Sequence, residues 1–418
     1  MSVYAHGFGG GNGLPVPRWL LAYVLGIVIV LAFVVLRFVR PPPRRAADDA
    51  NATTRSHDLA PVENGIWPRW FVVTRGIGLF LLVATFISGA IGTNDSGANI
   101  APVTVIVLFF LGMQLVSFAF GDIFWWFNPF DTLAAVFFRD DGSRNRQAPS
   151  WTAAAFLASF VWFVFAYPEF YPPTPHEVAT FLAVYTVAVV ACAGVWGRSW
   201  VRRGEGFGAL FGGLAQLGRR RESGPELAPL LVVYLGGILF DGMSQTMWWI
   251  KILGSTRGWD ERAINTVGFI WSIAIVGVAY IAATRIIATI THTPASETAR
   301  RFARVMLAIG LALSVAHYLP AVLIDVQNFY ALLSDPLGRG WNVFGTIDYA
   351  IDQQVLTTTQ MGLLQSVLLG LGCVGAAVIA HDAAFENYRG RAAVRATYPI
   401  ATLLIVGSVG AIWLLLGS

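Results

Sequence analysis

LSVAHYLPAVLIDVQNFYALLSDPLGRGWNVFGTIDYAIDQQVL, residues 313–356, begins in an apolar helix, passes through a polar loop and enters a second apolar helix. Ionisable groups so close to membrane-spanning segments are costly to bury, so they are candidate functional residues. The stretch therefore predicts a helical membrane protein and the region of its site. Its histidine and acidic residues are His317, Asp325, Asp335, Asp348 and Asp352.

The composition of the whole chain supports this fold class. Of 418 residues, 56% are hydrophobic and 12% are charged, whereas a soluble domain has about 25% charged residues. This composition predicts an all-α, polytopic bundle that forms a single transmembrane domain over residues 1–418. The formal net charge of +4 is spread over short loops. That pattern excludes a nucleic-acid-binding patch and leaves the lipid bilayer and a small molecule as the expected partners.

Apolar runs predict about ten membrane-spanning helices, because a span needs roughly 20 apolar residues. Between the spans we expect a linker at 39–69, an amphipathic helix on the membrane surface at 199–222 and a loop at 325–352. Residues 121–138 are expected to form a turn and an interfacial or re-entrant helix. The predicted spans are residues 19–38, 70–92, 101–121, 152–168, 178–196, 227–245, 264–290, 303–324, 353–381 and 397–416.

The distribution of arginine predicts the orientation of the chain. With an even number of spans, the Arg-rich segments at 40–69, 198–221, 300–304 and 389–395 all fall on one side of the membrane. Cytoplasmic loops carry the excess of basic residues, so this side is predicted to be the inner one. Both termini are then outside, and residues 1–18 form an outer N-terminal arm.

Three of the predicted spans carry polar residues along one helical face. Lipid would reject such faces, so we expect them to turn toward one another around an outward-facing polar cavity. The alternative is that these groups only join neighbouring helices by hydrogen bonds. The residues are Tyr234, Asp241 and Gln245 in the sixth span, Ser314, His317, Tyr318 and Asp325 in the eighth, and Gln353, Gln354 and Gln365 in the ninth.

Asp241 and His317 are predicted to lie at the same depth. Each follows the start of its predicted span, residue 227 or 303, by the same number of residues, which places both roughly 21 Å from the inner end. We therefore predict a catalytic group around this pair. Its members are His317, Asp241 and Asp325 as catalytic residues, with Tyr318, Gln245, Gln353, Gln354 and Asp335 as substrate-binding residues.

A divalent metal such as zinc is one expectation for this cavity. Asp241 and His317, with His6 of the N-terminal arm or Asp325 as a third ligand, would form a site in which the metal activates a water for attack on an ester. His6 would join only if the glycine-rich arm folds over the cavity. The chain contains neither HExxH nor GxSxG, so no catalytic motif identifies the reaction.

Several motifs resemble a known family. They are AHGFG at 5–9, FNPFDTL at 127–133, FDGMSQT at 240–246, AHYLPAVL at 316–323, LLSDPLGRGWNVFGTIDY at 332–349 and AHDAAF at 380–385. Together they resemble the bacterial membrane proteins known as fenitrothion hydrolases. The resemblance implies hydrolysis of an organophosphorus ester at its phosphorus–aryloxy bond, in the bacterial cytoplasmic membrane. It also implies a site with His6, Asp241, His317 and Asp335. The family often reads GHxxG in the ninth span, where this chain has Cys373.

Two other functions remain open on the residues alone. A proton-coupled transporter or a small-molecule-binding protein would use Asp241, His317 and Asp352 to hold its ligand or a proton. It would also need a polar path inward, past Gln365 toward Arg75. A non-catalytic subunit of a membrane assembly would explain why no catalytic motif is present.

Overall fold

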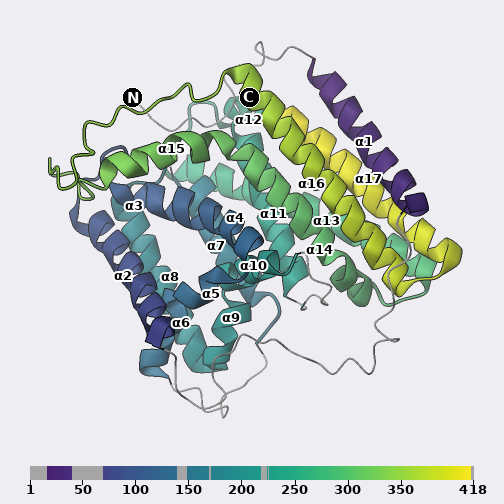
Figure 1. The fold of residues 1–418 in the computed structure, drawn as a ribbon, viewed down its shortest axis with the longest axis horizontal. Coiled ribbons are helices and arrows are strands. Elements are labelled where there is room, and N and C mark those ends of the chain that lie inside the picture. Colours follow the sequence, from purple (N-terminus) through teal and green to yellow (C-terminus); the bar gives the residue numbers. More distant parts are fainter. Residues whose placement is uncertain are drawn as a thin grey trace.

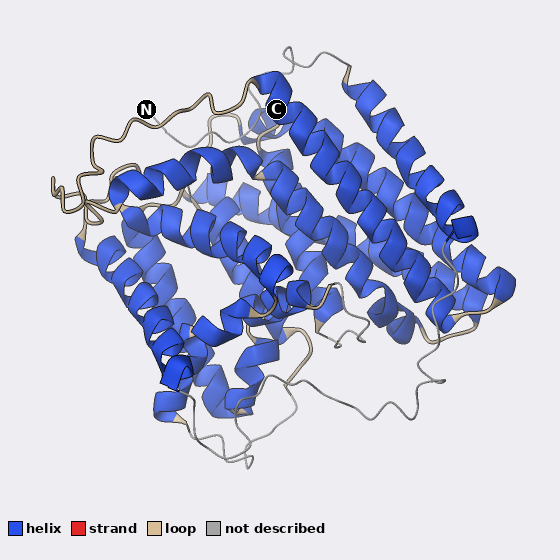
Figure 2. Ribbon diagram, in the orientation of Figure 1, coloured by secondary structure: helices blue, strands red, loops and turns tan. Residues whose placement is uncertain are grey.

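The structure, a computed structural model, describes residues 17–39, 69–138, 148–168, 171–217, 224 and 226–415. Every regular element in these ranges is a helix (Figure 2), so the predicted all-α class is confirmed. The predicted N-terminal arm at 1–18 and the linker at 39–69 lie almost entirely outside the described residues. His6 is therefore outside them too.

Helices that run in alternating directions make up the bundle (Figure 1). Among the described residues, eight helical stretches are long and apolar enough to cross a membrane, and a bent pair makes up to nine. The shorter helix α7 (Thr152–Phe165) completes a count close to the ten predicted. The eight are α1 (Arg18–Val39), α2 (Arg69–Ile91), the run α3–η1–α4 (Ile100–Val103, Thr104–Gly112, Met113–Phe120), α8 (Pro175–Trp196), α11 (Leu227–Ser244), α13 (Trp259–Thr291), α16 (Thr358–Asn387) and α17 (Gly390–Leu415).

Exposed apolar side chains identify the surface that meets lipid. Phe38 of α1, Ile270 of α13 and Val406 of α17 are all more than half exposed, as expected where the surrounding solvent is hydrocarbon rather than water. In contrast, α11 is the most enclosed of the long apolar helices and packs against α7, α13 and α14. The chain is therefore a multi-pass membrane protein with α11 near its centre.

The bundle has two opposite ends, a loop face and an arginine face. The loop face carries α12 (Met247–Leu253) and the loops at 92–99 and 333–357, and it forms the upper left edge of Figure 1. The arginine face is the opposite end, with the connection from α8 to α10 (Gly206–Ala215) and the turns that join α13 to α14 and α16 to α17. The loops of the loop face contact one another, since the Thr93 N–H donates to the Leu337 carbonyl at 2.8 Å.

The predicted eighth span is broken into two helices. α14 (Ala295–His317) and α15 (Leu319–Leu332) are bent by 60° at Tyr318. Pro320 explains the break, because proline has no N–H and its ring clashes with the carbonyl four residues before it, that of Ala316. The Gln365 side chain of α16 donates to this carbonyl at 2.6 Å, so the lost backbone bond is replaced from a neighbouring helix.

This break changes two predicted boundaries. Residues 325–332, predicted to belong to a loop, continue α15, and the loop covers 333–357 instead. The ninth span begins at Thr358 rather than at residue 353. Thr357 and Gln360 explain the start, since they form a capping box in which each side chain satisfies a backbone N–H of the first turn.

The prediction of a surface helix at 199–222 is wrong. The chain forms η2 (Arg198–Trp200), α9 (Val201–Gly204) and α10 instead, and the apolar side chains of α10 are buried. They pack against α4 and α7, which offer apolar area that a sequence pattern does not reveal. Residues 121–138, expected to form a turn and one interfacial or re-entrant helix, form two short helices, α5 (Ile123–Phe127) and α6 (Pro129–Phe137), which are separated at Asn128.

The replaced backbone bond leads to a stability test. Gln365→Leu should leave the buried Ala316 carbonyl without a partner and should cost about 1–3 kcal/mol of unfolding free energy. Thermal unfolding in detergent measures this as a lower Tm. Adding Pro320→Ala supplies a backbone N–H to the same carbonyl, so the double variant should recover part of the loss. A Gln365→Leu protein with the wild-type Tm would contradict this role.

Candidate functional site

The side chains of Asp241 and His317 form a buried pair between α11 and α14. His317 Nε2 lies 2.8 Å from Asp241 Oδ2, and the side chains are 10% and 5% exposed. Gln245, one turn after Asp241, donates to Asp241 Oδ1 at 3.2 Å. With Tyr318, which packs on the His317 ring, four of the predicted site residues lie together, from the predicted sixth and eighth spans.

The ring of His317 is held on two sides. Its position at the end of α14 follows from the break at Pro320, and its Nε2 atom contacts Asp241. Tyr318 packs edge-on against it, with 4.6 Å between ring centroids, and itself stacks on Phe165 of α7 at 5.9 Å. Because both contacts constrain the imidazole plane, its second nitrogen also has a defined direction.

This second nitrogen, Nδ1, gives the pair its chemical capability. Among the described residues, His317 has no hydrogen-bond partner other than Asp241. When Asp241 is ionised, its carboxylate accepts the proton on Nε2, and Nδ1 then carries a free lone pair. A histidine oriented by a buried carboxylate in this way can remove a proton from water or from a substrate.

An apolar cavity of about 290 Å³ adjoins the pair. Its walls come from α11, α13, α14 and α17, and His317 lines the end nearest the loop face. The remaining lining residues are aliphatic or aromatic, apart from the hydroxyl of Tyr280. This cavity differs from the polar cavity expected among the sixth, eighth and ninth spans, because it lies between the apolar faces of four helices and α16 does not line it.

The other predicted site residues lie elsewhere. Asp325 is buried on α15, beyond the break. Asp335 organises the loop at 333–357, since it accepts the Arg339 N–H at 2.9 Å and the Gly340 N–H at 2.5 Å. Gln353 and Gln354 are exposed on the same loop, because α16 begins after them.

The described residues do not complete the expected metal site. Zinc in a catalytic site takes three protein ligands. In the described ranges, no third His, Cys, Asp or Glu joins Asp241 and His317 in a group that could hold a metal ion. His6, the other expected ligand, lies outside those ranges. The Asp241–His317 pair is the part of the expected site that the described residues show.

Comparison of the chain with protein-family models, with curated proteins and with solved structures finds no match. The resemblance to fenitrothion hydrolases thus stays a prediction that depends on the motifs quoted above. The site itself is defined by the geometry of Asp241, His317 and the cavity.

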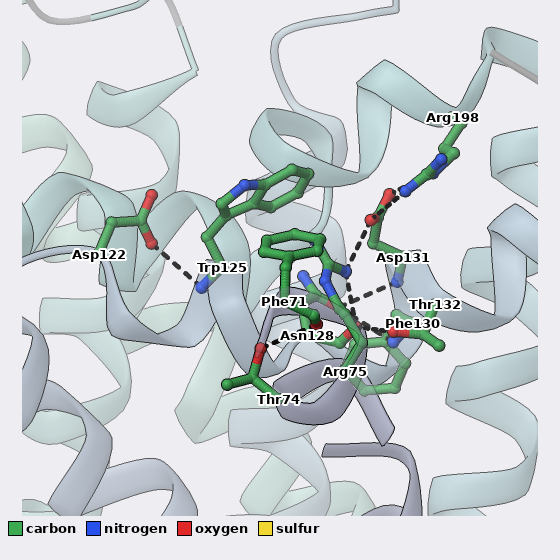
Figure 3. A network of polar contacts seen from close by, with 10 residues as sticks. All are labelled: Phe71, Thr74, Arg75, Asp122, Trp125, Asn128, Phe130, Asp131, Thr132 and Arg198. Carbon is green, nitrogen blue, oxygen red and sulfur yellow. Dashed lines mark hydrogen bonds and ion pairs between the residues drawn. The ribbon is translucent and has the colours of Figure 1, made fainter. Parts of the chain in front are cut away.

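A second buried polar network lies toward the arginine face (Figure 3). Asp131 of α6 pairs with Arg75 of α2 at 2.6 Å and with Arg198 of η2 through two hydrogen bonds of 2.9 and 2.8 Å. Arg75 also donates to the Asn128 carbonyl at 3.0 Å and lies 4.6 Å from the ring centroid of Trp125. The sequence pattern did not predict this network, because arginines near the ends of membrane helices are usually expected to reach the membrane surface.

The network joins three separate segments. Asn128 caps α6 by accepting the N–H groups of Phe130 and Asp131 at 3.0 Å each, and Asp131 then ties α6 to α2 and to the end of α8. The motif Asn-Pro-x-Asp was a usable signal, since it is typical of a capped helix start. We interpret this network as structural, because its charged groups bind one another.

Glu205 is a third buried ionisable residue, between α9 and α10. It accepts hydrogen bonds from the Tyr185 hydroxyl and from the backbone N–H groups of Phe207 and Gly208. Burial raises the pKa of Glu205 from its ordinary 4.5 to about 7. Its role is to cap the buried helix α10 where water cannot do so.

Breaking the Arg75–Asp131 pair should destabilise the fold. Removing one partner of a buried ion pair leaves the other charge uncompensated, which costs about 3–5 kcal/mol. We expect Arg75→Met to lower the Tm strongly. The control is Arg202→Met, because the Arg202–Asp122 pair is longer, at 3.4 Å, and more exposed, and such pairs contribute about 0–1 kcal/mol. Equal Tm values for the two variants would contradict the structural role.

Glu205 should make the stability depend on pH. With its pKa raised in the folded state, Glu205 holds a proton that the unfolded chain releases between pH 4.5 and about 7. The contribution of Glu205 to the free energy of unfolding is fully present below that pH interval and is lost as pH rises through it. The Tm of the wild type should therefore fall with rising pH more steeply than that of Glu205→Gln. Glu297→Gln, at a part-exposed pair with Arg301, should keep the wild-type slope.

Proposed function

We propose that this protein is a membrane-embedded hydrolase of apolar esters, with His317 as general base and Asp241 as the carboxylate that orients it. The observation that supports this most is that one imidazole both contacts a buried carboxylate and lines an apolar cavity. The motif resemblance indicates which bond is cleaved, the phosphorus–aryloxy bond of an organophosphorus ester. An aryl phosphotriester is apolar enough to enter such a cavity.

The proposed reaction is a direct hydrolysis by water. Nδ1 of His317 removes a proton from the water as its oxygen forms a bond to phosphorus, and the aryloxide leaves with the electron pair of the broken bond. The Asp241 carboxylate stabilises the imidazolium that forms. The proton then passes from His317 to the aryloxide or to water. Gln245 holds Asp241 in place throughout, as a positioning residue.

The same proposal includes the location of the protein. Described arginines gather at the arginine face, on η2, on α9 and at the start of α14. Because basic residues mark the cytoplasmic side, we place the arginine face inside and the loop face outside, in the bacterial cytoplasmic membrane. The Asp241–His317 pair then lies in the outer part of the bilayer, and both termini lie outside.

The buried pair also favours a second candidate, proton-coupled transport, because Asp and His chains inside membrane proteins carry protons. That function needs a polar path across the whole bundle. The path expected past Gln365 has its amide N–H bound to the Ala316 carbonyl, and Arg75 belongs to the network around Asp131. Hydrolysis therefore accounts for more of the described geometry.

Hydrolysis of a dialkyl nitroaryl phosphotriester by the purified protein tests the proposal. General-base catalysis contributes about 10²–10⁴-fold, so His317→Ala should lower kcat by roughly that factor. Asp241→Asn should also lower kcat, because an amide cannot stabilise the imidazolium. The control is His381→Gln, since His381 is another buried histidine at the far end of α16, and it should retain kcat.

Two outcomes would contradict the hydrolase. One is a wild-type protein that is inactive on this phosphotriester and on a nitrophenyl carboxylate ester. The other is full activity in His317→Ala. Proton uptake into liposomes that depends on His317 would then support transport instead.

A further inference from the structure

We propose that the cavity beside His317 is a groove for one hydrocarbon chain of a lipid-like ester, which reaches the Asp241–His317 pair sideways from the bilayer. This inference rests on the proposed function and adds the substrate class. The substrate would be an amphiphile with its ester group at His317 and a long alkyl or acyl chain along the groove.

The length of the cavity supports a chain as the occupant. The lining residues of α14 recur every three or four positions, which places them on one face of the helix. From Phe302 to His317 this face extends roughly 22 Å at 1.5 Å per residue. A volume of about 290 Å³ spread over that length is a narrow slot rather than a round pocket. The residues are Phe302, Val305, Met306, Ile309, Leu313 and His317.

The chemistry of the lining sets the direction in which an amphiphile would lie. Tyr280, near the opposite end, donates its hydroxyl to the Ala299 carbonyl, so this group is already used. His317 is then the polar group available to a ligand at the cavity wall. An ester group would therefore lie at His317, toward the loop face, and its chain would point toward the middle of the bundle.

The position of the groove supports access from lipid. Two of its lining residues, Ile275 of α13 and Val406 of α17, are 39% and 65% exposed on the apolar outer surface. Small residues follow Val406 on α17, and a Cβ added at Gly407 or Gly410 would meet no atom within 4 Å. The groove thus reaches the surface where acyl chains surround the protein.

Binding here would depend on fit rather than on the hydrophobic effect. A chain that moves from lipid into the groove leaves one apolar environment for another, so it gains packing contacts but little transfer free energy. Discrimination between substrates with the same chain should therefore come from the ester group at His317, whereas a chain too short to fill the groove lacks the packing contacts and binds less well. The chain serves to place that group beside Nδ1.

A chain-length series tests the groove. The wild type should hydrolyse nitrophenyl laurate with a kcat/KM about tenfold or more above that for nitrophenyl acetate. Gly407→Leu should fill the groove and remove this preference, by lowering kcat/KM for the laurate ester toward the value for the acetate ester. Gly375→Leu is the matched control, since Gly375 is an exposed helical glycine of α16 with equal free space, and it should keep the wild-type preference.

A second measurement separates the groove from the hydrolase. A laurate ester that carries a photoactivatable diazirine should label α13 and α17 in the wild type, and Gly407→Leu should reduce that labelling severalfold. Labelling without any hydrolysis would support the groove and overturn the proposed hydrolase. Hydrolysis that is independent of chain length, with equal labelling in the wild type and Gly407→Leu, would overturn the groove and leave the hydrolase in place.

Discussion

The hydrogen bond from Gln365 to the Ala316 carbonyl is the interaction on which the architecture of the site depends. Within lipid, every backbone polar group must find a partner inside the protein, and Pro320 removes one such partner. Because α16 supplies the replacement, α14 can end at His317 and α15 can turn by 60° onto the loop face. Without this bond, the Ala316 carbonyl would be buried without a partner, since Pro320 has no N–H to donate to it.

The bundle contains two buried ionic groups, around Asp131 and around Asp241, and they differ in whether a polar atom remains available to a ligand. Asp131 is bound by both Arg75 and Arg198, and together they join three segments of the chain. Asp241 is bound by His317 and Gln245 and belongs to a smaller group. One nitrogen of His317 stays available beside an apolar cavity. That difference, rather than burial itself, is why only the second group is proposed as a reactive site.

Part of the site was predictable because helix geometry relates sequence position to depth. In the predicted spans, which begin at residues 227 and 303, Asp241 and His317 are equally far from the start, so their common depth followed from a rise of 1.5 Å per residue. Gln353 and Gln354 were assigned to the site on the assumption that the ninth helix began at residue 353. The capping box at Thr357 and Gln360 starts that helix later and leaves both glutamines exposed on the loop.

The sequence by itself determined that the protein lies in a membrane, that it is helical, how many spans it has approximately, and that Asp241 and His317 lie at a common depth. These features depend on local composition and on periodicity, which a single chain displays directly. Only the tertiary structure decided the burial of α10, the ion network around Asp131 and the groove between α13 and α17. Each of these depends on how helices distant in sequence pack side by side, and apolar helices of similar composition can pack in many ways.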